Sequence, residues 1–208
     1  MKKYTRLNYV QMEENVGRSI RFIRHGLTAG NLEKRYVGST DEGLCEAGKQ
    51  LIIEKSCLYP FSEGEIIYAS PLSRCKETAE ILFPAIKPIL HKGLRECDFG
   101  EFEYRNYLEL SGNSNYQAWI DSGGTLDFPG GEGNEAFKER CIKAYEEIIL
   151  NTGNAPITFV VHGGTIMAIL DKYSLEKKNY FDWQLKNGEG YLCELKGKFS
   201  FKVLHKLS

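Results

Sequence analysis

Four short apolar segments recur along the chain, each bounded by polar or turn-forming residues. They begin at Ser19 (SIRFIRHG), Glu65 (EIIYAS), Lys87 (KPILHKGL) and Pro156 (PITFVVHG). Segments of this length that are rich in Ile, Val, Phe and Tyr are typical of β-strands. We therefore predict four strands, and we expect GYLCEL and FSFKVLH near the end of the chain to form a closing hairpin or a pair of edge strands.

Helical periodicity separates these strands. We predict helices over residues 46–58, 71–83 and 134–150, the second with Pro71 in its first turn. The spacing within the third helix places the following residues on one face: Phe137, Cys141, Ala144, Tyr145 and Ile148. Strands that alternate with helices predict an α/β protein with a mainly parallel sheet.

Between residues 98 and 133 the pattern weakens into glycines, aromatic residues and acids. Long irregular segments inside compact domains are often functional, so we predict a lid or insertion here that forms the substrate-facing wall. Residues 1–18 are polar and irregular. We expect them to be an N-terminal extension that packs on a single domain over residues 19–208.

The composition excludes several classes of partner. The chain has 208 residues, 27 basic and 28 acidic, so its formal net charge of -1 creates no field for nucleic acid or an anionic membrane. It has no apolar stretch near the roughly 18 residues that span a bilayer, and its start is polar. We expect a cytoplasmic protein with neither nucleic-acid nor membrane partners, while the pattern indicates no particular oligomeric state.

The six cysteines are scattered without a CxxC pair. We interpret them as reduced thiols, because zinc and redox sites usually require close pairs. Cys97, beside a candidate site residue, is an alternative nucleophile, although nothing in its neighbouring sequence singles it out.

Residues with reactive or charged side chains follow the predicted strands at four places. These are Arg24-His25-Gly26, Ser70–Arg74, Leu94-Arg95-Glu96 and His162-Gly163-Gly164. In open α/β sheets ligands bind at the carboxyl ends of the strands, where glycines at a helix start leave N–H groups free for an anion. We therefore expect the four segments to form one pocket.

Such a pocket fits phosphoryl transfer. A neutral His25 can attack phosphorus while Arg24 and Arg74 offset the charge of the phosphoryl oxygens, and Glu96 is the candidate general acid. Taken alone, His162 could equally be a buried structural histidine, and the arginine and glutamate could be solvated surface residues. Because all of these residues are predicted at one edge of the sheet, we favour a functional role for them. No cluster has metal-ligand spacing, so we expect neither metal nor cofactor.

The segment RHGLTAGN resembles the opening signature of the histidine phosphatase superfamily, also called phosphoglycerate mutase-like, and the resemblance covers nearly everything after residue 18. It implies that His25 is the nucleophile and that Arg24, Thr28 and Asn31 bind phosphate. It also implies a three-layer α/β/α sandwich and a phosphatase that works through a phosphohistidine on a small-molecule phosphomonoester.

Later segments are similar to further motifs of the family. SPLSRCKETA carries Arg74, LRECDFGEFE points to Glu96 as the acid, and VVHGGTI implies that His162 and Gly163 bind phosphate. The family pattern R-x-x-G-x-x-D is similar to Arg35, Gly38 and Asp41. DEGLCEAG departs from the family, because Gly43 and Cys45 replace a proline and a helix-capping threonine. We therefore expect an altered start to the next helix.

Within the family, the lid region looks most like that of alpha-ribazole phosphatases and similar small-molecule phosphatases. Alpha-ribazole 5′-phosphate is thus a candidate substrate, and Tyr104, Tyr116 and Trp119 either stack on a nucleoside-like group or simply pack. The alternatives are a phosphoglycerate mutase or sugar bisphosphatase, a protein phosphatase of the same family, and a silent binding module. The compact stretch before His162 favours hydrolysis over mutase activity, and the presence of His25 and Glu96 argues against the silent module.

Overall fold

A six-stranded sheet forms the centre of the computed structural model, which describes residues 17–208. The strand order is β3-β2-β4-β1-β5-β6. Their bounds are Ser19–Arg24 (β1), Ile66–Ala69 (β2), Ile89–Leu90 (β3), Ile157–Val161 (β4), Gly190–Leu195 (β5) and Phe201–Leu207 (β6). The first four strands pair in parallel, and β5 and β6 close one side in antiparallel fashion. All six predicted strands are present.

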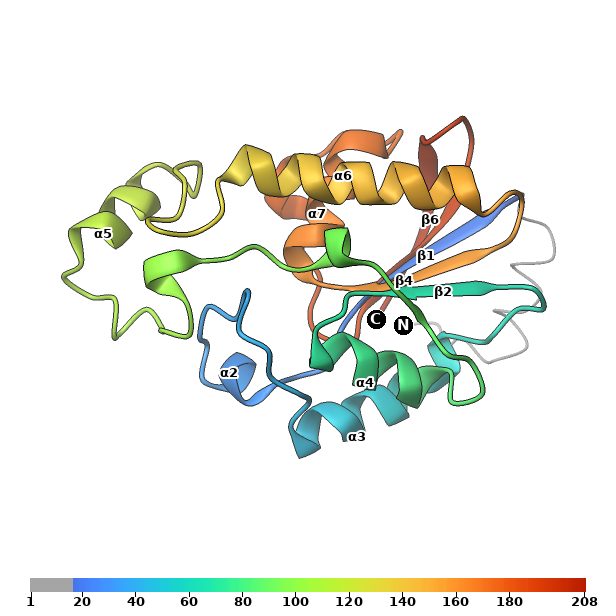
Figure 1. The fold of residues 1–208 in the computed structure, drawn as a ribbon, viewed down its shortest axis with the longest axis horizontal. Helices are drawn as coiled ribbons and strands as arrows, with labels where there is room; N and C mark the ends of the chain where they lie inside the picture. Colours follow the sequence, from blue (N-terminus) through green and yellow to red (C-terminus); the bar gives the residue numbers. More distant parts are fainter. Residues whose placement is uncertain (1–16) are drawn as a thin grey trace.

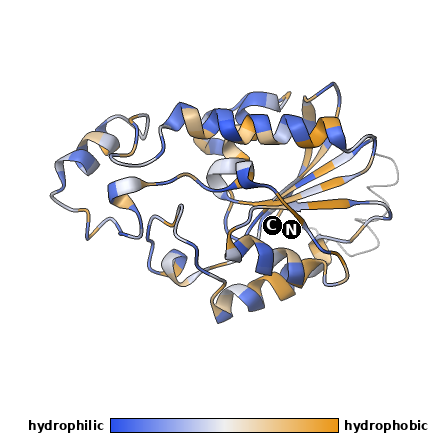
Figure 2. Cartoon of the chain, in the orientation of Figure 1, coloured by the Kyte–Doolittle hydropathy of each residue, from blue (hydrophilic) through white to orange (hydrophobic). Residues whose placement is uncertain are grey.

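Helices cover both faces of this sheet (Figure 1). On one face lie α3 (Glu46–Lys55) and α4 (Ser73–Leu82), and on the other lie α6 (Asn134–Asn151) and α7 (Gly163–Tyr173). The expected three-layer α/β/α sandwich with a mainly parallel sheet is confirmed. Both faces of the central strands are covered, so β4 is apolar apart from Thr158, whereas β1 alternates apolar residues with Ser19, Arg21 and Arg24 (Figure 2).

Alternation along the central strands divides the core into two layers. In β1, Phe22 packs with the cluster under α6 and α7, whereas its neighbour Ile23 packs with the cluster under α3 and α4. Phe159 and Val160 of β4 divide in the same way. Adjacent residues of a strand point to opposite faces, so β1 and β4 hold both helical layers in place.

The helices agree closely with those predicted from the sequence. The predicted helix 46–58 is α3 followed by a 3-10 turn, η1 (Ser56–Leu58), and the five residues predicted on one face of α6 are all buried. The predicted helix 71–83 begins two residues later than expected, at Ser73. The α7 helix had no separate prediction.

The start of α3, where the sequence predicts an altered cap, is contacted by Glu77 of α4. Cys45 occupies the N-cap without a side-chain hydrogen bond, so the helix forms without the usual cap. The Glu77 carboxylate instead accepts the backbone N–H of Leu44 at 3.1 Å. A Cβ atom on Gly43 would lie 2.3 Å from Glu77, so glycine allows this approach.

The segment 98–133 is more ordered than its sequence indicates. It contains η3 (Gly100–Phe102) and α5 (Ser114–Asp121), which lies at one end of the molecule, away from the sheet (Figure 1). Phe102, Tyr116 and Trp119 pack against one another there. The segment is thus a folded wall held by aromatic contacts.

The predicted extension lies almost entirely outside the described residues, since its first sixteen positions fall there. Arg18 donates to the Thr152 hydroxyl at 2.5 Å and to the Ala155 carbonyl at 3.0 Å, which fixes the approach to β1. Among residues 17–208, no helix is long and apolar enough to cross a membrane.

A buried ion pair in the central sheet gives a test of the fold. The Arg21 guanidinium of β1 contacts the Glu65 carboxylate at 2.5 Å, and both side chains are almost fully buried. Glu65 also accepts the Thr158 hydroxyl of β4. We expect Arg21→Met to destabilise the protein by about 3 to 5 kcal/mol in urea denaturation, because it leaves a buried carboxylate without its cation.

Lys196→Met is the matched control, since it removes the cation of an exposed pair with Glu194. We expect its urea midpoint to stay near that of the parent. Equal midpoints for both variants would contradict a structural role for the buried pair.

Candidate active site

Two histidines meet where adjacent parallel strands end. Arg24 pairs with Val161 as the last residues of β1 and β4, so His25 and His162 both leave the sheet at the same edge. Their ring centroids lie 5.2 Å apart in an edge-to-face arrangement. The predicted convergence of these two segments is therefore present.

His25 is held in one tautomer by the backbone. Its Nδ1 lies 2.7 Å from the Gly26 carbonyl, which can only accept, so Nδ1 carries the proton. Burial, reinforced by the charges of Arg74 and Arg24, holds the pKa of His25 well below its ordinary value. The neutral ring thus keeps a lone pair on Nε2, for which the described residues provide no hydrogen-bond partner.

His162 differs because both of its ring nitrogens are engaged. The Arg74 guanidinium donates from Nε to Nδ1 at 3.3 Å, and Nε2 lies 2.7 Å from the Ser70 hydroxyl. Burial and the nearby Arg74 charge hold the pKa of His162 well below its ordinary value, so this ring is also neutral. With Nδ1 accepting, Nε2 carries the proton and donates to Ser70. Of the two histidines, His25 alone has a free nitrogen lone pair.

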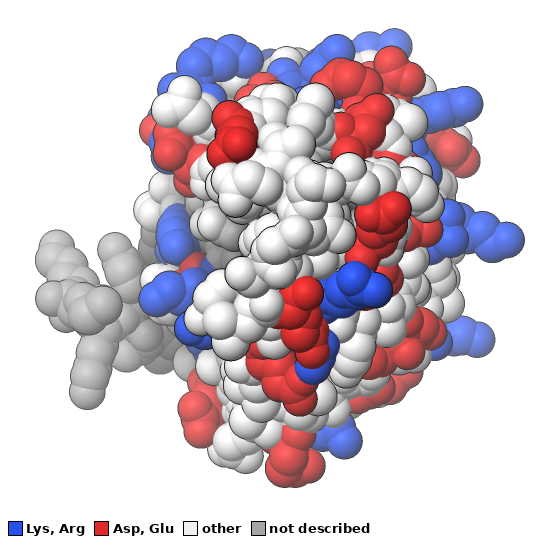
Figure 3. Space-filling model, turned by 90° about the vertical axis from the view of Figure 1, so that its left-hand side faces the viewer, with Lys and Arg blue, Asp and Glu red and all other residues white. Residues whose placement is uncertain are grey.

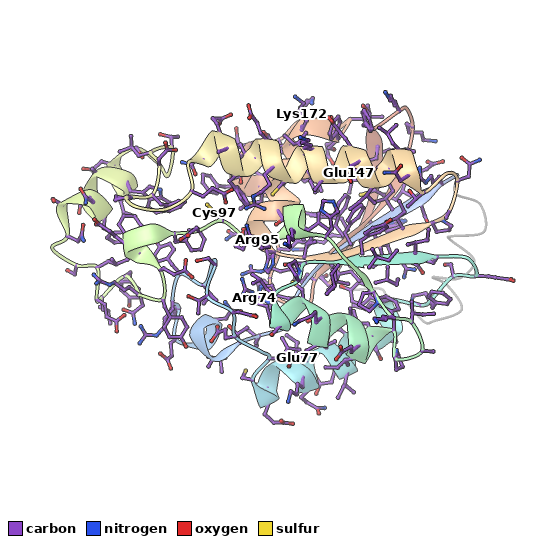
Figure 4. All side chains as sticks on the ribbon, in the orientation of Figure 1. Arg74, Glu77, Arg95, Cys97, Glu147 and Lys172 are labelled. Atoms are coloured by element: carbon purple, nitrogen blue, oxygen red, sulfur yellow. The ribbon has the colours of Figure 1, made fainter. Side chains whose placement is uncertain are left out.

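Arg74 is fixed by the segment that precedes α3. Its terminal nitrogens donate to the carbonyls of Gly38 at 2.7 Å and Thr40 at 2.8 Å. Asp41 in turn accepts the backbone N–H of Ser73 at 2.6 Å, at the start of α4. Each terminal nitrogen keeps one further hydrogen. Figure 4 shows Arg74 at the end of the sheet that faces α5.

Glu96 lies on the segment that follows β3. One carboxylate oxygen accepts the backbone N–H of Cys97 and the other that of Gly164 in α7, each at 3.1 Å. Burial raises the pKa of Glu96, although these two hydrogen bonds and the charges of Arg74 and Arg24 oppose the rise. A buried carboxyl with a raised pKa is a suitable proton donor.

A cavity of about 320 Å³ opens above this polar set. Arg24, Asn31, Glu96, Gly163 and Gly164 line it. Arg24 donates to the Leu185 carbonyl at 2.5 Å, while its buried Nε has no partner in the described part of the chain. Unpaired N–H groups of this kind and the start of α7 suit an anion.

Three members of the set lie outside the lining of this cavity and are more deeply buried. His25 is 3% exposed, and Arg74 and His162 are 0% exposed. Thr28, a predicted phosphate ligand, is buried as the N-cap of α2 (Ala29–Leu32) and shares reciprocal hydrogen bonds with Asn31. The structure therefore brings the predicted residues together, but it places Thr28 in a helix cap.

Asn187 completes the site and was not predicted. Its amide donates to the carbonyls of His25 and Gly26 at 3.2 Å and to the Asn31 side chain at 3.0 Å. It thereby fixes the loop that carries the nucleophile candidate. The only sequence signal is an Asn-Gly turn before β5, which indicates a turn and no more.

Cys97 is a poor nucleophile in this setting. It is 3% exposed, and its thiol points to the carbonyls of Asp98 at 3.7 Å and Glu132 at 3.8 Å. Burial and the Glu96 and Glu132 carboxylates raise the pKa of Cys97 far above its ordinary value. The thiol stays protonated, so the structure argues against this alternative.

Aromatic side chains form the outer walls of the cavity. They are Tyr36, Phe99, Trp119, Phe128, Phe137, Tyr180 and Phe181. Of the three aromatic residues named from the lid sequence, Trp119 lines the cavity. Tyr116 packs beside it with its hydroxyl 3.1 Å from that of Tyr36, and Tyr104 is an exposed residue that donates to Glu42.

Charge at the lid end of the molecule is mixed. Figure 3 shows acidic and basic side chains interspersed with uncharged surface over this end. Within residues 17–208, no group of three or more His, Cys, Asp or Glu side chains could hold a metal ion.

The geometry agrees with comparisons to known proteins. The family described as histidine phosphatase superfamily (branch 1) matches residues 20–205. The chain belongs to the histidine phosphatase superfamily. The match includes part or all of each of the six strands and all the residues of the candidate site, as the resemblance of the motifs implies.

Individual relatives of this superfamily carry phosphatase and mutase names. An uncharacterized phosphatase, PhoE, of Bacillus subtilis is 29% identical over 155 residues, or 73% of this chain and 75% of the relative. Phosphoglycerate mutase-like protein 4 of Arabidopsis thaliana is 29% identical over 158 residues, or 72% and 68% of the two chains. The chain therefore belongs among phosphatase and mutase enzymes.

Solved structures with the same fold include members of both groups. An alpha-ribazole phosphatase from Shigella flexneri superposes with a TM-score of 0.80 over 91% of this chain and 96% of its own. Because the two sequences are only 21% identical, this likeness shows a common fold and nothing about activity. A phosphoglycerate mutase from Thermus thermophilus, 26% identical, superposes with a TM-score of 0.69 over 91% and 98%.

The two neutral histidines predict an unusual dependence of stability on pH. Their folded-state pKa values are depressed, so below about pH 6.5 the unfolded chain binds protons that the folded chain does not. The free energy of unfolding should fall from pH 7.5 to pH 5.5, by up to about 1.4 kcal/mol per pH unit for each histidine. Urea denaturation across this window measures the slope.

His25→Asn/His162→Asn should flatten this slope, whereas His205→Asn on β6 should retain it. A double variant with the full slope of the parent would show that other groups cause the dependence.

Proposed function

We propose that this protein is a phosphomonoester hydrolase that transfers the phosphoryl group of a small metabolite to Nε2 of His25. The observation that carries the proposal is the state of this imidazole. It is neutral, its Nδ1–H is bound by Gly26, and Nε2 is free. An uncharged imidazole with a fixed lone pair can attack phosphorus directly.

In the first step Nε2 forms a bond to phosphorus as the ester P–O bond breaks. Arg24, Arg74 and the N–H groups at the start of α7 offset the charge on the phosphoryl oxygens. Glu96 gives its proton to the leaving oxygen and becomes a carboxylate. The products are the free alcohol and a phosphorylated, positively charged imidazole ring.

In the second step water attacks the phosphorus atom and the N–P bond breaks. The Glu96 carboxylate takes a proton from this water, so inorganic phosphate leaves and the acid is regenerated. His25 returns to its neutral form, with its proton still on Nδ1.

The cavity walls favour a substrate that has one phosphate and an alcohol carrying a bulky, planar group. Aromatic side chains provide apolar faces beyond the polar end of the cavity. Arg35 also lines it, but its guanidinium already pairs with Glu33 and Glu109, each at 2.6 Å. Alpha-ribazole 5′-phosphate meets these requirements, and the fold likeness to an alpha-ribazole phosphatase is consistent with it.

Mutase activity is the second candidate, because several of the similar proteins are named as mutases or mutase-like. A mutase must bind the carboxylate and the second phosphate of its substrate. The pairing of Arg35 leaves the aromatic part of the cavity poorly suited to such groups.

Phosphate release from a substrate panel tests the proposal. The panel contains alpha-ribazole 5′-phosphate, phosphoglycerates, fructose bisphosphates, nucleotides and a phosphopeptide. We expect a planar monophosphate to have the highest kcat/KM, and His25→Ala to lose at least about 10³-fold on every substrate. Equal turnover by parent and His25→Ala would overturn the mechanism, and net phosphoryl exchange between phosphoglycerates would favour the mutase.

Chelation gives an independent test. Arginine side chains and the start of α7 supply the positive field of this scheme, so exhaustive treatment with EDTA should leave turnover unchanged. Loss of turnover that an added divalent cation restores would contradict this arrangement.

A further inference from the structure

A guanidinium from α6 holds the segment that carries Glu96, together with the Thr165 hydroxyl of α7, which donates to the carbonyls of Leu94 and Arg95 at 3.4 Å. Arg140 donates from Nη1 to the carbonyls of Gly93 at 3.0 Å and Arg95 at 3.1 Å, and from Nη2 to that of Glu96 at 3.3 Å. Three carbonyls within four residues thus converge on one side chain. The ring of Phe137, a cavity-lining residue one turn earlier, packs beneath this guanidinium.

A carboxylate completes the arrangement from the other side. Glu132 accepts from Arg140 at two nitrogens, at 2.8 Å and 2.6 Å, in a bidentate pair. Its backbone N–H donates to the Asp98 carbonyl at 2.9 Å. The pair therefore fixes the chain both before and after Glu96, and its charges balance within the pair.

We propose that Arg140, paired with Glu132, is a positioning residue that orients Glu96 for proton transfer to the leaving oxygen. The inference rests on the proposed function and adds a residue that touches neither phosphate nor alcohol. Within residues 17–208, the carboxylate oxygens of Glu96 are bound only by backbone N–H groups of Cys97 and Gly164. Their positions follow from the course of the backbone that Arg140 fixes.

The test exploits the leaving group. An alkyl phosphate needs a proton on its leaving oxygen, whereas p-nitrophenyl phosphate releases a stable phenolate that does not. We expect Arg140→Met to slow single-turnover cleavage of the alkyl ester by about 10- to 100-fold and that of p-nitrophenyl phosphate by less than about threefold, with KM little changed. Lys143→Met, an exposed change on the same helix, should leave both rates as in the parent.

Two further variants distinguish failure of the positioning role from failure of the proposed function. Glu96→Gln should reproduce the selective loss on the alkyl ester, and His25→Ala should abolish cleavage of both esters. Retained cleavage in His25→Ala would refute the proposed function itself. With that function intact, equal losses on both esters in Arg140→Met, or no loss on either, would overturn the positioning role. If Arg140→Met does not fold, Arg140→Lys carries the test, with the same selective loss expected.

Discussion

The site depends on keeping the imidazole of His25 uncharged in a pocket that contains two arginines. The charges that suit Arg24 and Arg74 to a phosphoryl group also oppose protonation of the ring, and burial acts in the same direction. The Gly26 carbonyl then fixes the remaining proton on Nδ1. One arrangement thus favours both the anion and the lone pair that would attack it.

This arrangement has its origin in the parallel pairing of β1 and β4. Their register brings His25 and His162 to one edge, and α7 starts at the same point, where Gly163 and Gly164 line the cavity. The other elements support that edge. The segment before α3 binds Arg74, the chain after β3 supplies Glu96, and the turn before β5 supplies Asn187. Each of these three segments contributes contacts to the site that lies at the ends of β1 and β4.

The sequence predicted those features that depend on residues close together along the chain. Apolar periodicity located the strands and α6, and motif residues such as His25 and Glu96 could be placed from the strands that precede them. Long-range contacts were not readable. The hydrogen bonds of Asn187 join positions more than 150 residues apart. The order within the lid likewise arises from aromatic contacts between Tyr36 and distant residues such as Trp119.

The central claim concerns one atom, Nε2 of His25. The most direct measurement is to load Glu96→Gln with p-nitrophenyl phosphate, quench it in alkali and locate the phosphoryl group by mass spectrometry and by ¹⁵N–³¹P coupling. We expect an alkali-stable, acid-labile phosphoryl group on Nε2 of His25 that accumulates because the second step lacks its base. A phosphoryl group on His162, on a cysteine or on Nδ1, or turnover without any covalent intermediate, would contradict it.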